Sequence, residues 1–209
     1  MAKQQRSVAV MRAVTDAVIE RLWSGDETMI RIPEVCAATG VNYGSVYHHF
    51  GSREGVIDAA YTELFRRAVG EDLAVLRRAA AEARAPRDFL NVVRTLGGCT
   101  PSADAAGHSR AMRARVVAAA LVRPELRASV GAAIGATTDE LAEILATAQH
   151  RGLLRPDRAP RVLAAVLETL IFGRVLEDLS DAPVESSEWD QAIEDLLTGA
   201  EAGAAASYA

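Results

Sequence analysis

Strand-type alternation of β-branched and aromatic residues is nearly absent from this chain of 209 residues, in which Ala, Leu, Glu and Arg are abundant. These residues are strong helix formers, so the sequence predicts an all-α protein. Half of the residues are hydrophobic, enough for a sizeable core and an argument against disorder over most of the length. At roughly 150 residues per domain, the length fits one large domain or two small ones.

Apolar residues at helical spacing, interrupted by Gly and Pro, predict about nine helices. Four of them fall in the first eighty residues, and the other five follow an Ala-Pro break. The expected ranges are 6–23, 32–39, 42–49, 52–78, 87–96, 104–121, 124–151, 158–179 and 187–197. We expect a loop at 97–102 and frayed residues from 198 onward.

Charge, cysteine content and hydropathy exclude several classes of protein. The formal charge is −5, whereas proteins that bind nucleic acid usually carry a basic surface, so the net charge taken alone argues against nucleic-acid binding. Cys36 and Cys99 lie far apart without a C-x-x-C partner, so we expect neither a disulfide framework nor a structural zinc site. No segment approaches about 18 uninterrupted apolar residues, and no signal-peptide run is present, which predicts a cytoplasmic protein with no membrane partner.

Residues 32–50 have the pattern of two short helices joined by a tight turn. Gly40 permits the left-handed backbone that such a turn needs, and Asn42 is a favourable N-cap for the second helix. Val35 and Val41 supply the apolar contact between the two helices. This is the pattern of a helix-turn-helix, whose second helix is short enough to enter the major groove of DNA.

The run IPEVCAATGVNYGSVYHHFGSREGVI, residues 32–57, resembles the DNA-binding signature of the TetR/AcrR family of bacterial transcriptional regulators. That signature is roughly I-A-x-x-A-G-V-S-x-x-x-(L/V)-Y-x-(H/Y)-F-x-(S/N)-K-E-x-L. The departures Cys36, Thr39, Asn42 and Arg53 are mild, because Asn caps as Ser does and Arg reaches a phosphate as Lys does. Pro33 stands where some members have an Arg that contacts DNA, which removes one contact.

The resemblance implies a three-helix DNA-binding domain at residues 1–53, with the fourth helix from 52 as a connector. A helical ligand-binding and dimerisation domain is then expected at 54–200 and a flexible tail at 201–209. Tyr47 is expected to meet a phosphate, whereas Tyr43 contacts a thymine methyl, contacts a phosphate or packs on a neighbouring helix. The residues expected at DNA are Thr39, Asn42, Tyr43, Gly44, Ser45, Tyr47, His48, His49 and Arg53.

Charged side chains near these helices suggest further backbone contacts. Arg53 begins the long fourth helix, where free N–H groups and the helix dipole favour an anion. Lys3 and Arg6 either add phosphate contacts or form an ordinary solvated terminus. His48 and His49 are adjacent on a helix and point about 100° apart, so we expect backbone contacts from them and no metal site.

Beyond residue 80 the resemblance is one of architecture, because family members bind ligands in a divergent helical domain and dimerise through their last two long helices. The bulky apolar residues expected to line the ligand site are Phe65, Leu73, Phe89, Val93, Leu96, Met112 and Val116. Few aromatic and polar groups occur there, which favours an apolar or amphipathic ligand. A wide apolar face and the last helix predict the dimer interface: Leu163, Val166, Leu167, Leu170, Ile171, Arg174, Trp189, Ile193 and Leu196.

The expected function is that of a homodimeric repressor that binds a pseudo-palindromic double-stranded DNA operator and leaves it when a small molecule binds. No cofactor and no catalytic residue are expected. An activator, or a regulator of this fold controlled by a partner protein, stays open as an alternative. A small all-α enzyme using Cys99, Asp104 and His108 is remote, because their spacing matches no catalytic or metal-binding pattern.

Charge is divided unevenly along the chain. Residues 1–53 hold 6 Lys or Arg and 5 Asp or Glu, a net charge of +1, whereas residues 54–209 hold 17 and 23, a net charge of −6. The acidity therefore belongs mainly to the expected regulatory domain. With few cations per subunit, we expect weak non-specific binding and an affinity that depends on two correctly spaced half-sites.

Overall fold

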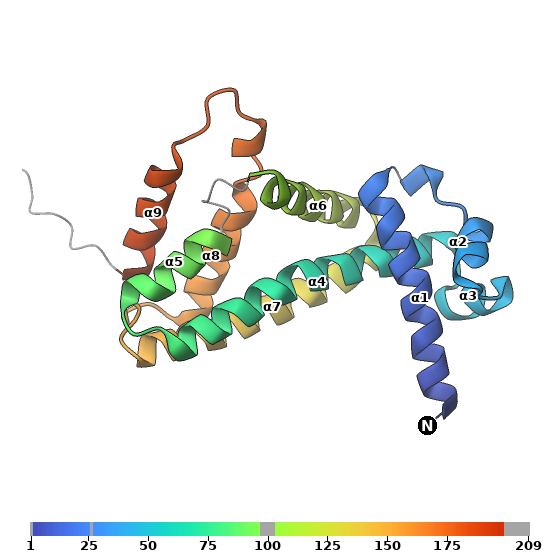
Figure 1. Cartoon of the computed structure of the whole chain (residues 1–209), viewed down its shortest axis with the longest axis horizontal. Helices are drawn as coiled ribbons and strands as arrows, with labels where there is room; N and C mark the ends of the chain where they lie inside the picture. The colour runs from blue at the N-terminus through green and yellow to red at the C-terminus, as the bar shows by residue number, and fades with distance from the viewer. Residues whose placement is uncertain (1, 26, 97–102, 199–209) are drawn as a thin grey trace, which may run out of the picture. The chain divides into compact units, whose positions relative to one another are not determined.

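The computed structural model describes residues 2–25, 27–96 and 103–198, with side-chain detail for 7–25, 27–96 and 110–198 (Figure 1). Every regular element in these residues is a helix, which confirms the all-α prediction. They are α1 (Ala2–Ser24), η1 (Glu27–Met29), α2 (Ile32–Thr39), α3 (Tyr43–Phe50), α4 (Arg53–Glu82), α5 (Pro86–Leu96), α6 (Ala103–Val122), α7 (Pro124–His150), α8 (Pro160–Gly173), η2 (Glu177–Leu179) and α9 (Ser186–Thr198). None of the described helices is long and apolar enough to cross a membrane.

The chain forms two compact units, each built from two stretches of sequence. The first unit contains Met1–Arg67 and Arg115–Ala133, and the second contains Ala68–Ala114 and Ile134–Ala209. Helices α4, α6 and α7 therefore each contribute residues to both units. The expected boundary at residue 53 divides the chain by function, and it stays a prediction.

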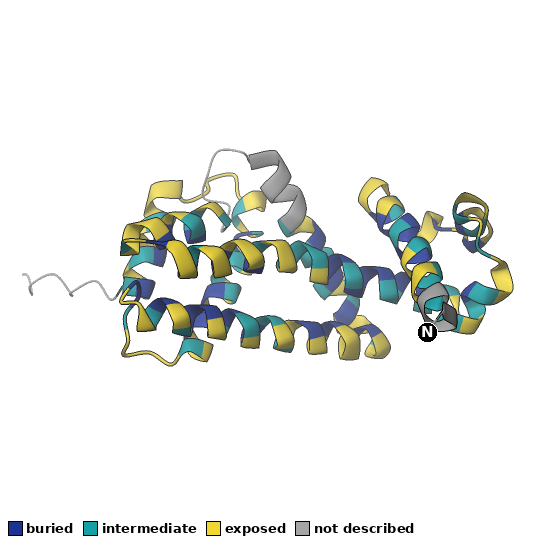
Figure 2. Cartoon of the chain, turned by 60° about the horizontal axis from the view of Figure 1, so that its bottom comes forward, coloured by how far each residue is buried: buried dark blue, intermediate teal, exposed yellow. Residues whose placement is uncertain are grey.

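The core of the first unit is formed where α1, α2 and α3 pack against one another. Val14, Val18 and Leu22 lie at intervals of four residues on α1 and are fully buried, because this spacing keeps side chains on one face of a helix. Val35 of α2 and Val46 of α3 are also fully buried. Figure 2 colours buried residues dark blue and exposed residues yellow along the helices. The apolar spacing of three short segments thus produces one small core.

The turns around α3 follow the predicted caps. Gly40 ends α2 with a φ of 69°, in the left-handed region that side chains with a Cβ rarely adopt. Asn42 caps α3, its side-chain oxygen accepting a hydrogen bond of 2.8 Å from the Gly44 N–H. The Ser52 hydroxyl accepts a hydrogen bond of 2.9 Å from the Gly55 N–H at the start of α4. These contacts confirm the turn and the Asn42 cap, and Ser52 supplies a further cap at the start of α4.

The second unit has an apolar core to which α4, α5, α7, α8 and α9 contribute. Phe89, Leu145, Leu163, Leu167 and Ile193 are among its fully buried members. Together these large side chains explain how five amphipathic helices bury their apolar faces within one chain.

The helix predicted at 158–179 is shorter in the structure. Helix α8 ends at Gly173, and the chain continues in tight turns to η2, with hydrogen bonds such as that from Leu176 N–H to Gly173 oxygen. Glycine is a poor helix former, so the apolar pattern alone overestimated the length. Arg110 of α6 then holds η2 through two hydrogen bonds of 2.6 and 2.7 Å to the Asp178 carboxylate.

Candidate nucleic-acid interface

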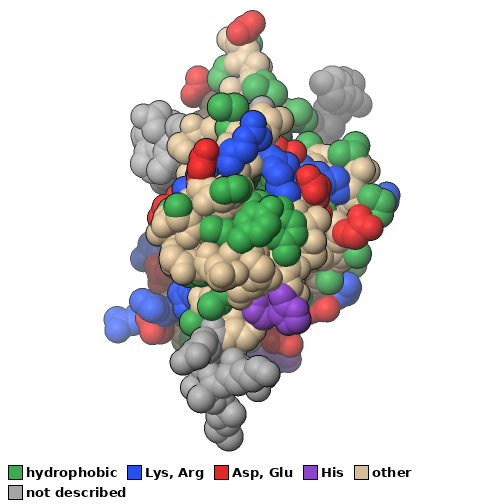
Figure 3. Space-filling model, turned by 90° about the vertical axis from the view of Figure 1, so that its right-hand side faces the viewer, with side chains coloured by type: hydrophobic (Ala, Val, Ile, Leu, Met, Phe, Trp, Pro, Cys, Tyr) green, Lys and Arg blue, Asp and Glu red, His purple; other side chains and the backbone are tan. Residues whose placement is uncertain are grey.

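The first turn of α3 carries exposed polar and aromatic groups. Asn42, Tyr43, Gly44 and His48 are exposed, with half of the Tyr43 surface accessible, whereas Ser45, Tyr47 and His49 are partly buried. Figure 3 looks onto the end of the chain that carries α2 and α3, where histidines border a patch of hydrophobic-class side chains, with basic and acidic groups around it. The expected DNA-reading residues of α3 thus lie together on an accessible helix.

Tyr43 and Tyr47 form an aromatic pair one turn apart on α3. Their ring centroids are 4.6 Å apart and their planes are inclined by 37°. The side-chain hydrogen bond with Tyr43, together with desolvation, raises the pKa of Tyr47, so its hydroxyl stays protonated at neutral pH. Tyr43 packs against a residue of its own helix and leaves half its surface open, an arrangement compatible with contact to a base or a phosphate.

The two histidines at the end of α3 differ in environment. His48 is exposed, whereas His49 is partly buried and its Nε2 lies 3.4 Å from the Ser7 hydroxyl of α1. Their ring centroids are 5.2 Å apart in an edge-on arrangement. Among the described residues, no three His, Cys, Asp or Glu side chains are grouped so that they could hold a metal ion.

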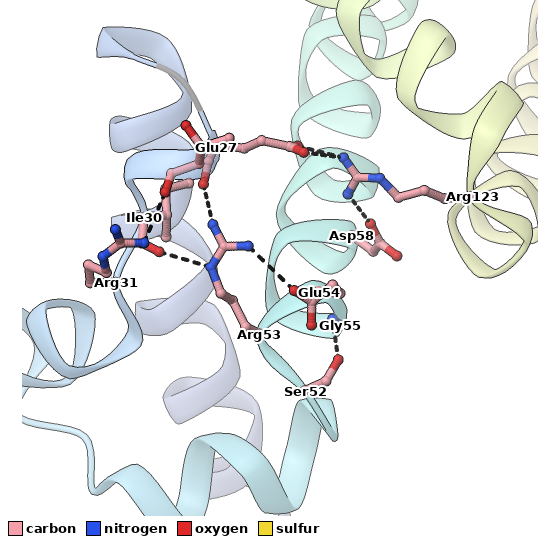
Figure 4. A network of polar contacts seen from close by, with 10 residues as sticks. Glu27, Ile30, Arg31, Ser52, Arg53, Glu54, Gly55, Asp58 and Arg123 are labelled. Carbon is pink, nitrogen blue, oxygen red and sulfur yellow. Dashed lines mark hydrogen bonds and ion pairs between the residues drawn. The ribbon is translucent and has the colours of Figure 1, made fainter.

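Two of the expected DNA contacts are instead engaged within the chain. The Thr39 hydroxyl is partly buried and donates a hydrogen bond of 2.8 Å to the Val35 carbonyl. The Arg53 guanidinium donates a 3.0 Å hydrogen bond to the Ile30 carbonyl and another to the Glu27 carbonyl (Figure 4). Arg53 therefore stabilises the segment between α1 and α2. The family resemblance, which placed Arg53 at a DNA phosphate, did not predict this role.

The sequence pattern also does not predict a polar cluster that joins the segment before α2 to α4. Arg123, the single residue between α6 and α7, contacts the carboxylates of Glu27 and Asp58 (Figure 4). Its guanidinium carbon lies 5.6 Å from the centre of the Tyr61 ring. No local motif reveals such a cluster, because its members come from segments far apart in the sequence.

The candidate ligand residues do not all fall in one unit. Leu73, Phe89 and Val93 belong to the core of the second unit, and Leu96 packs against it. Phe65 and Val116 belong to the first unit. The remaining candidate, Met112, is buried in the second unit. The structure therefore groups five of the seven candidates in the second unit.

The predicted dimer face needs correction. Leu163, Leu167 and Ile193 are fully buried within the chain, so they form core and offer no surface to a second copy. Arg174 is also buried, with its guanidinium carbon 5.3 Å from the centre of the Trp189 ring. Helical spacing identified apolar residues here but did not distinguish those that face the core from those that face solvent.

The other members of the predicted dimer set have accessible surface. Leu170, Ile171, Trp189 and Leu196 are partly buried, and Val166 is exposed. On α8, Val162 and Phe172 are exposed as well, although neither was in the predicted set. The accessible apolar face of α8 is thus rotated from the one expected.

The structure does not describe the side chains of Cys99, Asp104 and His108, on which the remote enzyme hypothesis depends. Cys99 lies outside the described residues, and the side chains of Asp104 and His108 are outside the part described in side-chain detail. Cys36 is a free cysteine, partly buried in α2.

A tight turn between two short helices, with the second helix exposed at its first turn, defines a helix-turn-helix DNA-binding protein. Residues 30–60 match the family model described as bacterial regulatory proteins of the tetR family. The helix-turn-helix segment of the chain is therefore similar to that of the TetR family of transcriptional regulators, as the resemblance implied. No curated protein matches its sequence.

Solved structures share the fold across nearly the whole chain. A TetR-family transcriptional regulator from Cytophaga hutchinsonii has a TM-score of 0.63 and 18% identity, covering 91% of this chain and 94% of that chain. Salmonella enterica GusR has a TM-score of 0.60 and 16% identity, covering 90% and 95%. A protein from Saccharomonospora viridis, solved in complex with choline, has a TM-score of 0.55 and 18% identity, covering 93% and 95%.

Proposed function

We propose that this chain is a homodimeric transcriptional repressor that a small apolar or amphipathic ligand releases from its operator. The observation that carries the proposal is the exposure of Asn42, Tyr43 and Gly44 at the start of α3, a helix of a size that fits the major groove. Ser45, Tyr47, His48 and His49 complete the proposed contact surface. Thr39 and Arg53 are left out because their side chains bind their own chain.

We place the dimer interface on the exposed face of α8. Val162, Val166 and Phe172 give this helix an accessible apolar surface. A two-fold dimer presents two copies of α3, and these reach successive major grooves when they are one turn of DNA apart, roughly 34–36 Å. The operator is therefore expected to be a pseudo-palindrome.

We place the ligand among apolar residues of the second unit: Leu73, Phe89, Val93, Leu96 and Met112. Apolar surroundings favour an apolar or amphipathic molecule. Such a ligand releases DNA when it binds the released conformation better than the DNA-bound one. A preference of a few kcal/mol is enough, since about 1.4 kcal/mol changes the ratio of two states tenfold.

Selection of binding sites from random double-stranded DNA by the full chain tests this function. The expected product is a family of sites with two related half-sites, which the purified protein then releases when members of a small-molecule library are added. Failure to enrich any sequence would contradict the proposed operator binding. A selected site whose occupancy increases transcription would favour an activator instead.

A further inference from the structure

Arg123 joins three segments of the first unit that are far apart in the sequence. As the residue between α6 and α7, it places one guanidinium nitrogen 2.6 and 2.7 Å from the two Glu27 carboxylate oxygens. Its other terminal nitrogen lies 2.8 Å from the Asp58 carboxylate in α4. Glu27 begins η1, so one side chain ties the link between α1 and α2 to the start of the long fourth helix.

The same link is held from its other side by Arg53. The Arg53 side chain donates hydrogen bonds to the carbonyls of Glu27 and Ile30, while its backbone lies just after the end of α3 (Figure 4). Glu27 therefore contacts Arg123 through its carboxylate and Arg53 through its carbonyl. A continuous set of contacts runs from the turn between α6 and α7 to the end of the recognition helix.

Arg115 of α6 adds a parallel contact to the same region. Its guanidinium donates hydrogen bonds of 3.0 Å to the carbonyls of Leu22 and Gly25, at the end of α1. These carbonyls lack intrahelical donors because the helix ends there. Two arginines from the segment 115–133 thus hold the residues that lead into α2.

The Arg123 contacts are partly shielded from water, so salt screens them less than it screens a surface ion pair. The Arg123 and Asp58 side chains are 23% and 16% exposed. Burial tends to raise the pKa of Glu27, but hydrogen bonds from Arg123 and Tyr61 outweigh it and lower the pKa. Burial, followed by the bond to Glu27, raises the pKa of Tyr61 to about 12.

We infer that Arg123 is a positioning residue for DNA binding. By holding Glu27, it fixes η1 and the start of α2, against which α3 packs, and so keeps the recognition helix in the orientation that fits the groove. Both terminal nitrogens of its guanidinium already bind carboxylates, so it acts through the protein rather than through a phosphate. The inference rests on the operator binding described under the proposed function and adds residues 115–133 to the DNA-reading unit.

The test compares operator affinity of the full chain and of two variants, Arg123→Gln and Glu27→Gln. Each is expected to weaken specific binding about tenfold, the size typical of coupling within one ion-pair network. The double variant should bind no more weakly than either single variant, because both remove the same link. Arg77→Gln is the matched control, since Arg77 pairs with Glu140 at 2.7 Å within the second unit, and it should bind as the wild type does.

Salt dependence and melting temperature separate positioning from other roles. The slope of log affinity against log salt should be unchanged in Arg123→Gln, because no phosphate contact is lost. A slope shallower by about one charge would overturn the inference in favour of a direct phosphate contact. Unchanged operator affinity in both single variants would overturn it as well, as would a loss explained entirely by unfolded protein.

Wild-type behaviour distinguishes this inference from the proposed function. If the wild-type chain binds no selected operator, the proposed function fails. If the wild type binds and both single variants bind equally well while folded, only the role of the Arg123 contacts fails.

Discussion

Tyr47 lies beside Tyr43 on α3, with its ring partly buried and its hydroxyl protonated at neutral pH. The ring fills space within the first unit, whereas the hydroxyl is the group able to donate a hydrogen bond to a phosphate. We therefore expect the ring to contribute to stability and the hydroxyl to contribute to DNA binding.

Replacement of Tyr47 by Phe should separate these contributions. The variant keeps the ring but loses the donor, so operator affinity should fall by about 1 kcal/mol, or roughly fivefold, while the melting temperature changes little. Fluorescence anisotropy with labelled operator and thermal unfolding measure the two quantities. Unchanged affinity would remove Tyr47 from the proposed contacts.

Gly55 makes the close approach of α3 and α4 possible. A Cβ at this position would lie only 2.1 Å from the Phe50 carbonyl oxygen, whereas a Cβ at Gly70 on the same helix would meet nothing within 4 Å. A side chain at position 55 would therefore collide with the end of α3, whereas position 70 has room for one.

Alanine at these two glycines should change stability in opposite directions. Gly55→Ala forces backbone apart and should lower the free energy of unfolding by roughly 1–3 kcal/mol. Gly70→Ala should raise it by roughly 0.5–1 kcal/mol, because Ala favours the helix. Urea unfolding measures both, and equal effects would show that the contact at Gly55 is not tight.

At the scale of elements, local signals predicted the helix-turn-helix well. Gly40 and Asn42 act within a few residues of themselves, so their turn and cap could be inferred without tertiary information. The end of α8 was overestimated because an apolar pattern continues past Gly173. The roles of Arg53 and Arg123 could not be inferred, since the groups they contact lie 23 to 96 residues away.

Helix α8 shows that helical spacing in the sequence also could not define the predicted dimer interface. Its spacing marked both Val166 and Leu167 as dimer residues, yet Leu167 is fully buried and Val166 is 38% exposed. Adjacent residues on a helix point about 100° apart, so a shift of one position exchanges core for surface.

Glutamate at these two positions should give distinct outcomes. Val166→Glu places a charge on the proposed interface and should yield folded monomers in sedimentation equilibrium. Leu167→Glu buries an unpaired charge and should lower the melting temperature sharply. A folded dimer of Val166→Glu would place the interface outside this face of α8.

At the scale of the whole molecule, the net charge of −5 limits how the protein holds DNA. A strongly basic protein binds any duplex through phosphates, whereas residues 1–53 of this chain carry a net charge of only +1, and Arg53 is engaged internally. In the proposed dimer, specific affinity then comes from two recognition helices that engage two half-sites together. The proposed operator binding therefore depends on the spacing between the two half-sites.

The most direct test measures the affinity of the full chain for its selected operator with and without five base pairs inserted between the half-sites. Five base pairs rotate one half-site by about half a helical turn, so both recognition helices can no longer enter their grooves from one face. We predict a loss of specific affinity to the level of a single half-site. Equal affinity for the two duplexes would contradict the account of a homodimer that reads a spaced, two-fold operator.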